Sequence, residues 1–205
     1  MPDGRIDAIR AKLAGVPLQP DLDAVARTAR ACRGGEGAAG RALVGASSRG
    51  TRAELRVAAA EGLVGAELLA EVATAAPDGR VRAVAVNRLE NQAALARIAR
   101  ADASMSVRVA AVARIKDPAV LAEIATTDGE RAVRRSVLPR ITDSAVLVAI
   151  AESDPDSDLR QMAVESFDFL DQRALARIAR SAAPPRVRRA AVLNPNLTDQ
   201  SLLAE

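Results

Sequence analysis

Apolar residues recur at helical spacing along most of the chain. In one representative stretch, Val107, Ala111 and Ile115 follow one another at intervals of four residues, and Leu121 and Ile124 are three residues apart. Each of these spacings places the apolar side chains on one face of an α-helix. The pattern therefore predicts two short helices in succession, each with one apolar face.

This two-helix pattern returns at a regular interval. Each return begins with an apolar residue followed by Arg, and successive pairs are separated by 26 residues four times and then by 28. A helix pair with one apolar face cannot cover that face alone, so neighbouring repeats are expected to stack. The predicted fold is all-α: a right-handed α-solenoid of about six stacked two-helix repeats over residues 51–205, with the last repeat incomplete. The pairs are Leu55-Arg56, Val81-Arg82, Val107-Arg108, Val133-Arg134, Leu159-Arg160 and Val187-Arg188.

Capping residues and prolines predict where the helices begin and end. Asp117-Pro118 stands before the second helix of its repeat, and an Asp or Asn at this place is a favourable N-cap. Pro139 falls inside a first helix, and Pro195 falls near the end of another, so both helices are expected to end early or to tighten. The matching cap positions are Asn91, Asp143, Asp171 and Asp199.

Two apolar columns are expected to pack between the helices. One is mostly small, which is typical of helices that cross closely, and the other is mostly large. The first column comprises Ala59, Ala85, Ala111, Val137, Ala163 and Ala191. The second comprises Leu63, Leu89, Ile115, Ile141 and Phe167, with Pro195 at the last place.

Upstream of residue 51 the repeat fades. Residues 1–50 are interpreted as an N-terminal helical cap in which the glycine-rich run at 34–40 forms a loop. At the other end, either the protein stops on a partial repeat at Glu205 or more chain follows it.

Composition favours helices and places the protein in the cytoplasm. The chain is 49% apolar, drawn almost entirely from aliphatic residues, with two Phe and no Trp or Tyr. No apolar stretch is long enough for a membrane span, and the N-terminus does not resemble a signal peptide. The lone cysteine, Cys32, fits a reducing compartment and is expected to be a buried, inert thiol.

The repeat, with the form VRxxAVxRIxDPAVLAEIA, resembles the bacterial leucine-rich repeat variant and related short HEAT-like repeats over about residues 51–205. The sequence AVLNPNLTDQSLLAE, with its Asn194-Pro195, is similar to the variant repeat in particular. That resemblance implies an interaction surface, and it implies that some second helices are of the 3₁₀ type. A founding member of the family carries a cysteine-ligated iron–sulfur cluster, and Cys32 alone does not supply its ligands.

Residues that carry catalysis are few, so we expect no enzyme, no cofactor and no metal. The chain has no His, which removes the commonest general base and a common metal ligand. The glycines at 34–40 lack the Lys-Ser or Lys-Thr of a phosphate-binding loop. The acids Glu152, Asp154, Asp156 and Asp158 are spaced too closely for a calcium loop and are better explained as helix caps.

The recurring Arg of each repeat allows two hypotheses. The column Arg56, Arg82, Arg108, Arg134, Arg160 and Arg188 could follow a phosphate backbone, or it could form a structural ladder. We favour the ladder, because Asp102, Asp128 and Asp154 each stand six residues before one of these arginines and can pair with it.

Other arginines are candidates for binding a partner. Arg88, Arg114 and Arg140 recur at one place in three repeats and are expected to face away from the core. A stretch without acids holds Arg173, Arg177, Arg180, Arg186 and Arg189, together with the ladder residue Arg188. This stretch is the best anion-binding candidate, although such a run is more often a solvated helical face.

The balance of charge separates two classes of function. Residues 51–205 hold 21 basic and 21 acidic residues, and the net charge of +3 comes from residues 1–50. A nucleic-acid-binding domain usually carries a clear positive excess, and stacking aromatics are scarce here. The sequence therefore favours a scaffold that binds another protein. The alternative is a HEAT-like nucleic-acid binder, or a base-processing enzyme built on such repeats.

Overall fold

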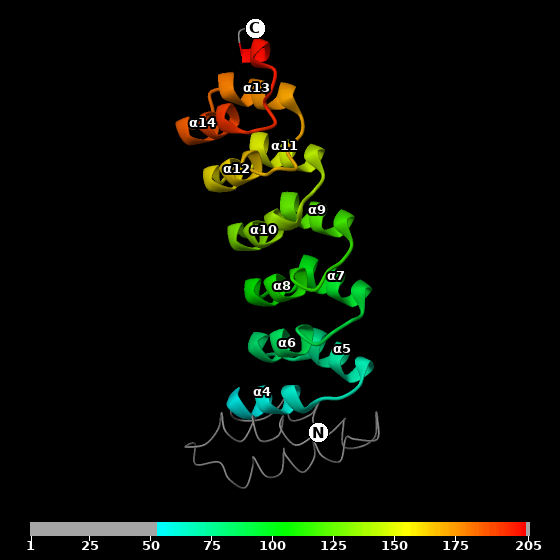
Figure 1. Cartoon of the computed structure of the whole chain (residues 1–205). Helices are drawn as coiled ribbons and strands as arrows, with labels where there is room; N and C mark the ends of the chain where they lie inside the picture. The colour runs from blue at the N-terminus through cyan, green and yellow to red at the C-terminus, as the bar shows by residue number, and fades with distance from the viewer. Residues whose placement is uncertain (1–52, 204–205) are drawn as a thin grey trace. The chain divides into compact units, whose positions relative to one another are not determined.

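The structure is a computed structural model, and it describes residues 53–203 apart from a few side chains at either end, those of residues 53–56, 58 and 200. The N-terminal cap predicted at 1–50, its glycine-rich loop and Cys32 lie outside the described residues, as does the side chain of Arg56. Within the described part the regular secondary structure is entirely helical (Figure 1).

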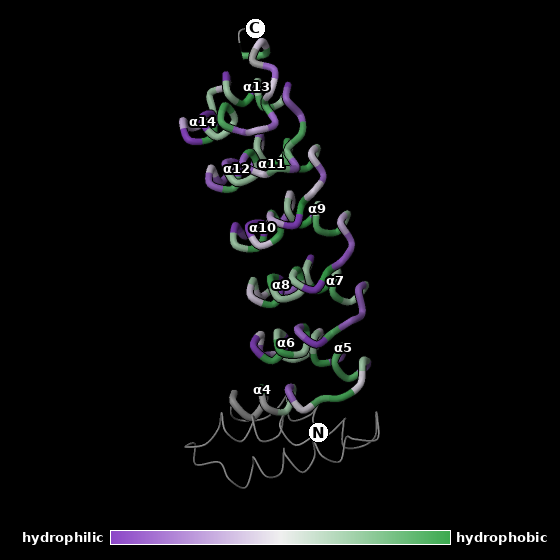
Figure 2. Tube along the Cα trace, in the orientation of Figure 1, coloured by the Kyte–Doolittle hydropathy of each residue, from purple (hydrophilic) through white to green (hydrophobic). Residues whose placement is uncertain are grey.

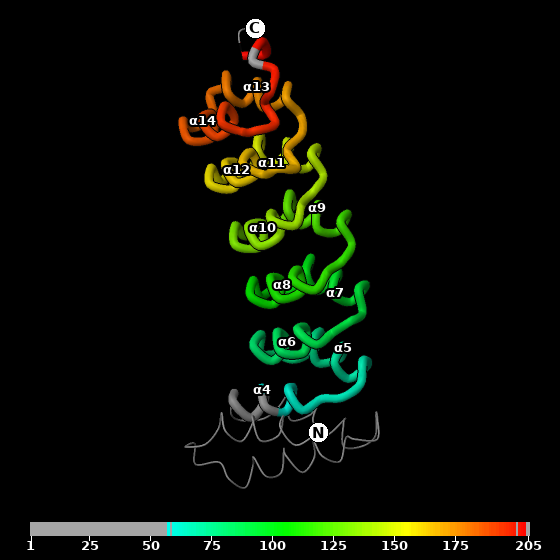
Figure 3. Tube along the Cα trace, viewed as in Figure 1, coloured from blue at the N-terminus to red at the C-terminus, as the bar shows by residue number. Residues whose placement is uncertain are grey.

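Two compact units divide the chain, Met1–Arg114 and Ile115–Glu205, here named unit 1 and unit 2. Figure 3 traces the alternation of first and second helices along the chain. The helices of unit 1 are α4 (Ala53–Gly62), α5 (Ala66–Ala75), α6 (Gly79–Val86), α7 (Gln92–Ala101) and α8 (Met105–Val112). Those of unit 2 are α9 (Pro118–Thr127), α10 (Arg131–Val137), η2 (Leu138–Arg140), α11 (Ser144–Ser153), α12 (Ser157–Val164), α13 (Gln172–Arg180), α14 (Pro185–Leu193) and η3 (Gln200–Leu203).

Each unit consists of helices packed in two layers. In unit 1, α4, α6 and α8 pack in succession, while α5 and α7 form the second layer and pack against α6 and α8 respectively. In unit 2, α9, α11 and α13 pack in succession, and each also packs against the helix that follows it, α10, α12 or α14. Figure 2 shows hydrophobic residues along the helices and hydrophilic residues at many of their connections.

Polar side chains cap the N-termini of the second helices α7, α9, α11 and α13, as predicted. Asn91 accepts a hydrogen bond from the N–H of Ala94, and Asp117 accepts one from Ala119. Asp143 and Asp171 do the same for α11 and α13. Each bond satisfies a backbone donor that has no partner inside the helix.

The small column is buried, which confirms its role in packing. Its six members, Ala59 to Ala191, are all 0% exposed. Within each unit, the first helices can therefore approach one another closely over these side chains.

The large column differs from its prediction at two places. Phe167 is 81% exposed, and Phe169 occupies the core position instead. Likewise Leu197, not Pro195, fills this position in the last repeat. The reason is that both repeats hold two extra residues in the turn after the first helix, so counting eight residues forward from Leu159 or Val187 places the wrong side chain in the core.

The prediction for proline is confirmed at one position and wrong at the other. Before Pro139, α10 ends at Val137 and the chain tightens into the 3₁₀ helix η2. In contrast α14 runs to Leu193 and is not shortened, because Pro195 lies in the turn beyond the helix. The second helices α5, α7, α9, α11 and α13 are α-helical, and the 3₁₀ geometry that the resemblance implied for some of them is found only at η3.

Candidate functional site

Two members of the Arg column, one in each unit, form bidentate ion pairs. In unit 1, α6 begins at its N-cap Asp78 and carries Arg82 one turn further on. Arg82 donates from Nε and Nη2 to the two carboxylate oxygens of Asp102, each at 2.7 Å. Its Nη1 donates to the carbonyl oxygens of Ala76 at 2.7 Å and Pro77 at 3.2 Å. The guanidinium of Arg82 thus joins the loop that precedes α6 to the loop that follows α7.

Unit 2 repeats this arrangement at a more deeply buried position. Arg134 donates from Nε and Nη2 to Asp154 at 2.8 and 3.1 Å, and from Nη1 to the carbonyl of Asp128 at 2.8 Å. The two side chains are 7% and 3% exposed. A buried guanidinium of this kind requires a partner for its charge, and Asp154 supplies it.

The acid that pairs with each Arg is not the one that the sequence predicted. The predicted partner was the carboxylate of the Asp six residues before each arginine. In the structure this Asp accepts a hydrogen bond through its main-chain carbonyl instead, Asp102 from Arg108 at 2.8 Å and Asp128 from Arg134. The carboxylate comes instead from 20 residues later, in the following loop. An extended Arg side chain on the first helix reaches past its own loop and meets the acid of the next repeat.

Asp102 is held in its charged form. Burial raises the pKa of this carboxyl, but the hydrogen bonds from Arg82 and from the N–H of Ser104, together with the charges of Arg82 and Arg108, outweigh that effect. The pKa of Asp102 therefore lies below its ordinary value. The hydrogen bond with Asp102 in turn raises the pKa of Arg82 against the effect of burial.

The column Arg88, Arg114 and Arg140 is engaged inside the chain. Arg88 donates to the carbonyls of Ala60 at 3.0 Å and Glu61 at 2.9 Å, and to that of Leu63. Arg114 and Arg140 donate to the carbonyls of Leu89 and Ile115, each 25 residues earlier. These guanidinium groups satisfy carbonyls at the end of the preceding first helix, where the helix dipole also favours a cation. The role of this column in binding a partner stays a prediction, since Arg114 and Arg140 are also exposed.

Asn196 takes the place of this arginine in the last repeat. Its Nδ2 donates to the carbonyls of Phe167 at 2.8 Å and Phe169 at 3.2 Å. The adjacent Asn194 is 4% exposed and donates from Nδ2 to the carbonyl of Val164 at 2.5 Å. The turn after α14 is thereby joined to the turn after α12.

The acid-free stretch divides into paired and unpaired arginines. Arg177 pairs with Glu152 at 2.8 Å, and Arg186 pairs with Asp158, although the stretch itself contains no acid. Asp158 belongs to the preceding first helix, which is why a count along one repeat does not find it. Arg188 donates to the carbonyl of Ala183 at 2.8 Å. Exposed arginines without a hydrogen bond or ion pair to any described residue are Arg173, Arg180 and Arg189.

The cluster of acids contributes caps and ion pairs. Asp156 accepts hydrogen bonds from the N–H groups of Asp158 and Leu159 and so begins α12. Its burial raises the pKa, but these bonds and the charges of Arg131 and Arg134 bring the pKa of Asp156 below its ordinary value. Over residues 53–203, no group of three or more acidic, Cys or His side chains is arranged to hold a metal ion. In the same part of the chain, no helix has the length and apolar character to cross a membrane.

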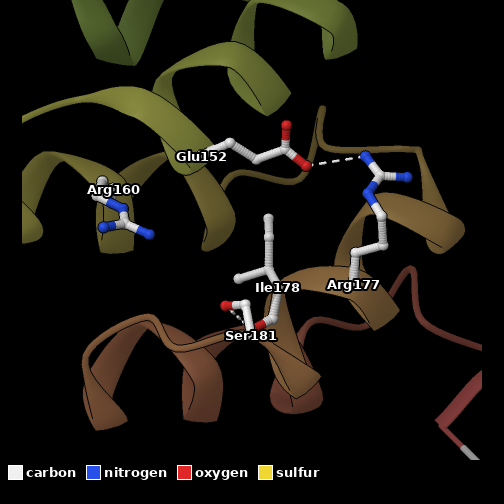
Figure 4. Close-up of a pocket in the computed structure, with 5 residues that line it drawn as sticks. All are labelled: Glu152, Arg160, Arg177, Ile178 and Ser181. Atoms are coloured by element: carbon white, nitrogen blue, oxygen red, sulfur yellow. Dashed lines mark hydrogen bonds and ion pairs between the residues drawn. The ribbon is translucent and has the colours of Figure 1, made fainter.

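A pocket of about 380 Å³ lies in unit 2 (Figure 4). It lies between α11, α12 and α13, and its lining includes the ion pair between Glu152 and Arg177. Arg160, a member of the ladder column, also faces it, with Ile178 and Ser181 on a further wall. In the earlier repeats an Asp stands 11 residues after the capping residue of the second helix, but the same count from Asp171 leads to Ala182. This count is the signal in the sequence that Arg160 has no ladder acid to pair with.

Large apolar side chains are exposed at the two turns that carry extra residues. Phe167 and Leu170 are 81% and 64% exposed, and Leu193, at the end of α14, is 67% exposed. We call these three residues the apolar cluster of unit 2. Their backbone segments are joined by the bonds of Asn194 and Asn196. Sequence reasoning missed the cluster because it placed Phe167 in the core.

Comparison with known proteins identifies no matching family model, no matching curated protein and no matching solved structure.

Proposed function

We propose that this chain is a non-catalytic scaffold of the cytoplasm that binds another protein. Its repeats would form a right-handed α-solenoid of the leucine-rich-repeat-variant or HEAT-like kind, with the 26-residue period of the sequence. The successive packing of helices within each unit supports this architecture. The lack of histidine in the sequence supports a role in binding over one in catalysis.

The exposed apolar cluster of unit 2 is the observation that carries the proposal. Phe167 is one of only two aromatic residues in the chain, yet it is 81% exposed, with Leu170 on the same turn. Exposed apolar patches mark interaction sites, and aromatic side chains are enriched at the centres of protein interfaces. Because this turn holds two extra residues, Phe167 points outward. Exposing its ring to water costs free energy that a bound partner would offset.

The contacts of the arginines favour a protein partner over a nucleic-acid partner. Arg82, Arg134 and the column that contains Arg88 use their guanidinium groups inside the chain. In the acid-free stretch, Arg177 and Arg186 are paired with acids. Three exposed arginines remain there, fewer phosphate contacts than salt-sensitive nucleic-acid binding generally uses.

Affinity capture from native lysate tests the proposal. The bait is the full chain as wild type, as Phe167→Ser, and as the matched control Val64→Ser, which changes a side chain that is 48% exposed in unit 1. We expect a protein to be retained by the wild type and the control, to be lost with Phe167→Ser, and to survive nuclease treatment. Retention that depends on nucleic acid, or that is equal for all three baits, would contradict the proposal.

A further inference from the structure

Arg160 differs from the ladder arginines Arg82 and Arg134 in what its guanidinium contacts. Arg82 and Arg134 each use Nε and Nη2 to bind a carboxylate and Nη1 to bind a loop carbonyl. Arg160 donates from Nε to the carbonyl of Ala151 at 2.8 Å, and neither of its terminal nitrogens makes a hydrogen bond or ion pair with a described residue. Four N–H groups of one half-buried guanidinium are therefore available.

The sequence places no acid at the position that would complete this rung. The ladder acids Asp102, Asp128 and Asp154 each stand 11 residues after the capping residue of their second helix. Counting the same distance from Asp171 leads to Ala182. Ser181 makes the backbone bond that the acid makes in the preceding repeat. It accepts the N–H of Ala183 at 3.1 Å, just as Asp154 accepts the N–H of Asp156, but it brings no carboxylate.

The space next to Arg160 is open and carries a net positive charge. The pocket of about 380 Å³ is lined by two guanidinium groups and one carboxylate (Figure 4). Glu152 is bound to Arg177 at 2.8 Å, so its charge is offset on the far side of the pocket from Arg160. Ile178 supplies an apolar wall against which the methylene groups of an acidic side chain can lie.

We propose that Arg160 and this pocket bind a carboxylate presented by a partner protein. The ligand group takes the place of the missing ladder acid and accepts hydrogen bonds from the terminal nitrogens of Arg160, as Asp102 and Asp154 do from Arg82 and Arg134. A carboxylate is favoured over a phosphate because the two filled rungs hold one planar carboxylate each. The pocket itself follows from the geometry, and the protein origin of the carboxylate rests on the proposed function.

The experiment uses the full chain, labelled with ¹⁵N, and four probes followed through the amide signals of Ile178 and Ser181. The first probe is an acetylated and amidated five-residue peptide with glutamate at its centre. The second has glutamine there, and the third is the glutamine peptide with a free C-terminal carboxylate. Inorganic phosphate is the fourth. We expect the first or the third peptide to bind and the second not to bind. Binding of the first peptide identifies a glutamate side chain as the source of the carboxylate, and binding of the third identifies a chain terminus. Phosphate is expected to bind more weakly than the better carboxylate.

Two pairs of variants show where the peptide binds. Arg160→Gln is expected to weaken binding about tenfold or more, because it removes charged hydrogen bonds. Arg189→Gln, which removes an equal charge from an exposed position, is expected to leave it unchanged. Ser181→Asp places a carboxylate on the pocket wall and should abolish binding, whereas Ser181→Asn should retain it.

The proposal is overturned if the glutamine peptide binds as well as both carboxylate peptides, or if phosphate binds as tightly as they do. Equal losses in Arg160→Gln and Arg189→Gln would also overturn it, because attraction to positive charge in general would then explain the binding. A glutamate peptide that binds at Arg160 when lysate yields no protein through Phe167 would leave the pocket standing and remove the proposed scaffold function. The reverse result would remove only the pocket.

Discussion

The substitution Asp154→Asn tests how much a ladder rung stabilises unit 2. The change keeps the shape of the side chain and removes its charge, so the guanidinium of Arg134, whose side chain is 7% exposed, loses its counter-ion. Arg134 would keep its bonds to the carbonyls of Asp128 and Gly129, which carry no net charge. Loss of one partner of a buried ion pair costs roughly 3–5 kcal/mol. Because whole domains are stable by about 5–15 kcal/mol, the free energy of unfolding should fall by a large fraction.

Urea unfolding followed by helical circular dichroism measures this loss. The matched control is Glu152→Gln, which breaks the ion pair with Arg177, also at 2.8 Å, where the two side chains are 40% and 54% exposed. An exposed pair contributes about 1 kcal/mol or less, so the control should lie close to the wild type. Should Asp154→Asn cost under about 1 kcal/mol, or no more than the control, the ladder would not stabilise the stack as argued.

Three further predictions concern stability. First, the pKa of Asp102 is lowered in the folded chain, so the stability that this carboxylate contributes is present above the unfolded pKa of about 3.9 and is lost as pH falls through the lower folded value. The difference in unfolding free energy between wild type and Asp102→Asn should therefore shrink between about pH 5 and 2. A difference that stays constant over this range would refute the prediction. Second, Leu121→Ala should cost about 2–5 kcal/mol, because this side chain is 3% exposed, and wild-type stability in urea would show that the buried face of α9 is misassigned. Third, Arg88→Met should cost about 1–3 kcal/mol, because it leaves carbonyls at the end of α4 without their donor. A neutral result in urea unfolding would show that these bonds do not stabilise unit 1.

Much of the fold could be predicted because the repeat fixes helical faces and caps locally. The spacing of Ala85, Ala111 and Ala163 depends only on helical geometry, and all three are buried as expected. Asp117 and Asp143 cap helices that begin at the next residue, a relation within a few residues of chain. Local rules of this kind do not require knowledge of how one repeat lies on another.

The site could not be predicted as well because it depends on contacts between repeats. For Arg134 the sequence offers an acid six residues before it and another 20 residues after it, and only the packing of the helices decides between them. The same holds for Arg88, whose acceptors lie 25–28 residues earlier. Phe167 was misplaced for a simpler reason, since two extra residues in a turn shift the count and turn an expected core residue outward.

Photo-crosslinking at position 167 tests the proposed function most directly. A photoreactive amino acid is placed at 167, or at 64 as the control, in the full chain, and the lysate is irradiated with and without nuclease treatment. The proposed scaffold predicts a discrete protein adduct at 167 that is absent at 64 and resists nuclease. Adducts of equal yield at both positions, or an adduct at 167 that nuclease removes, would contradict the proposal that the apolar cluster of unit 2 binds a protein.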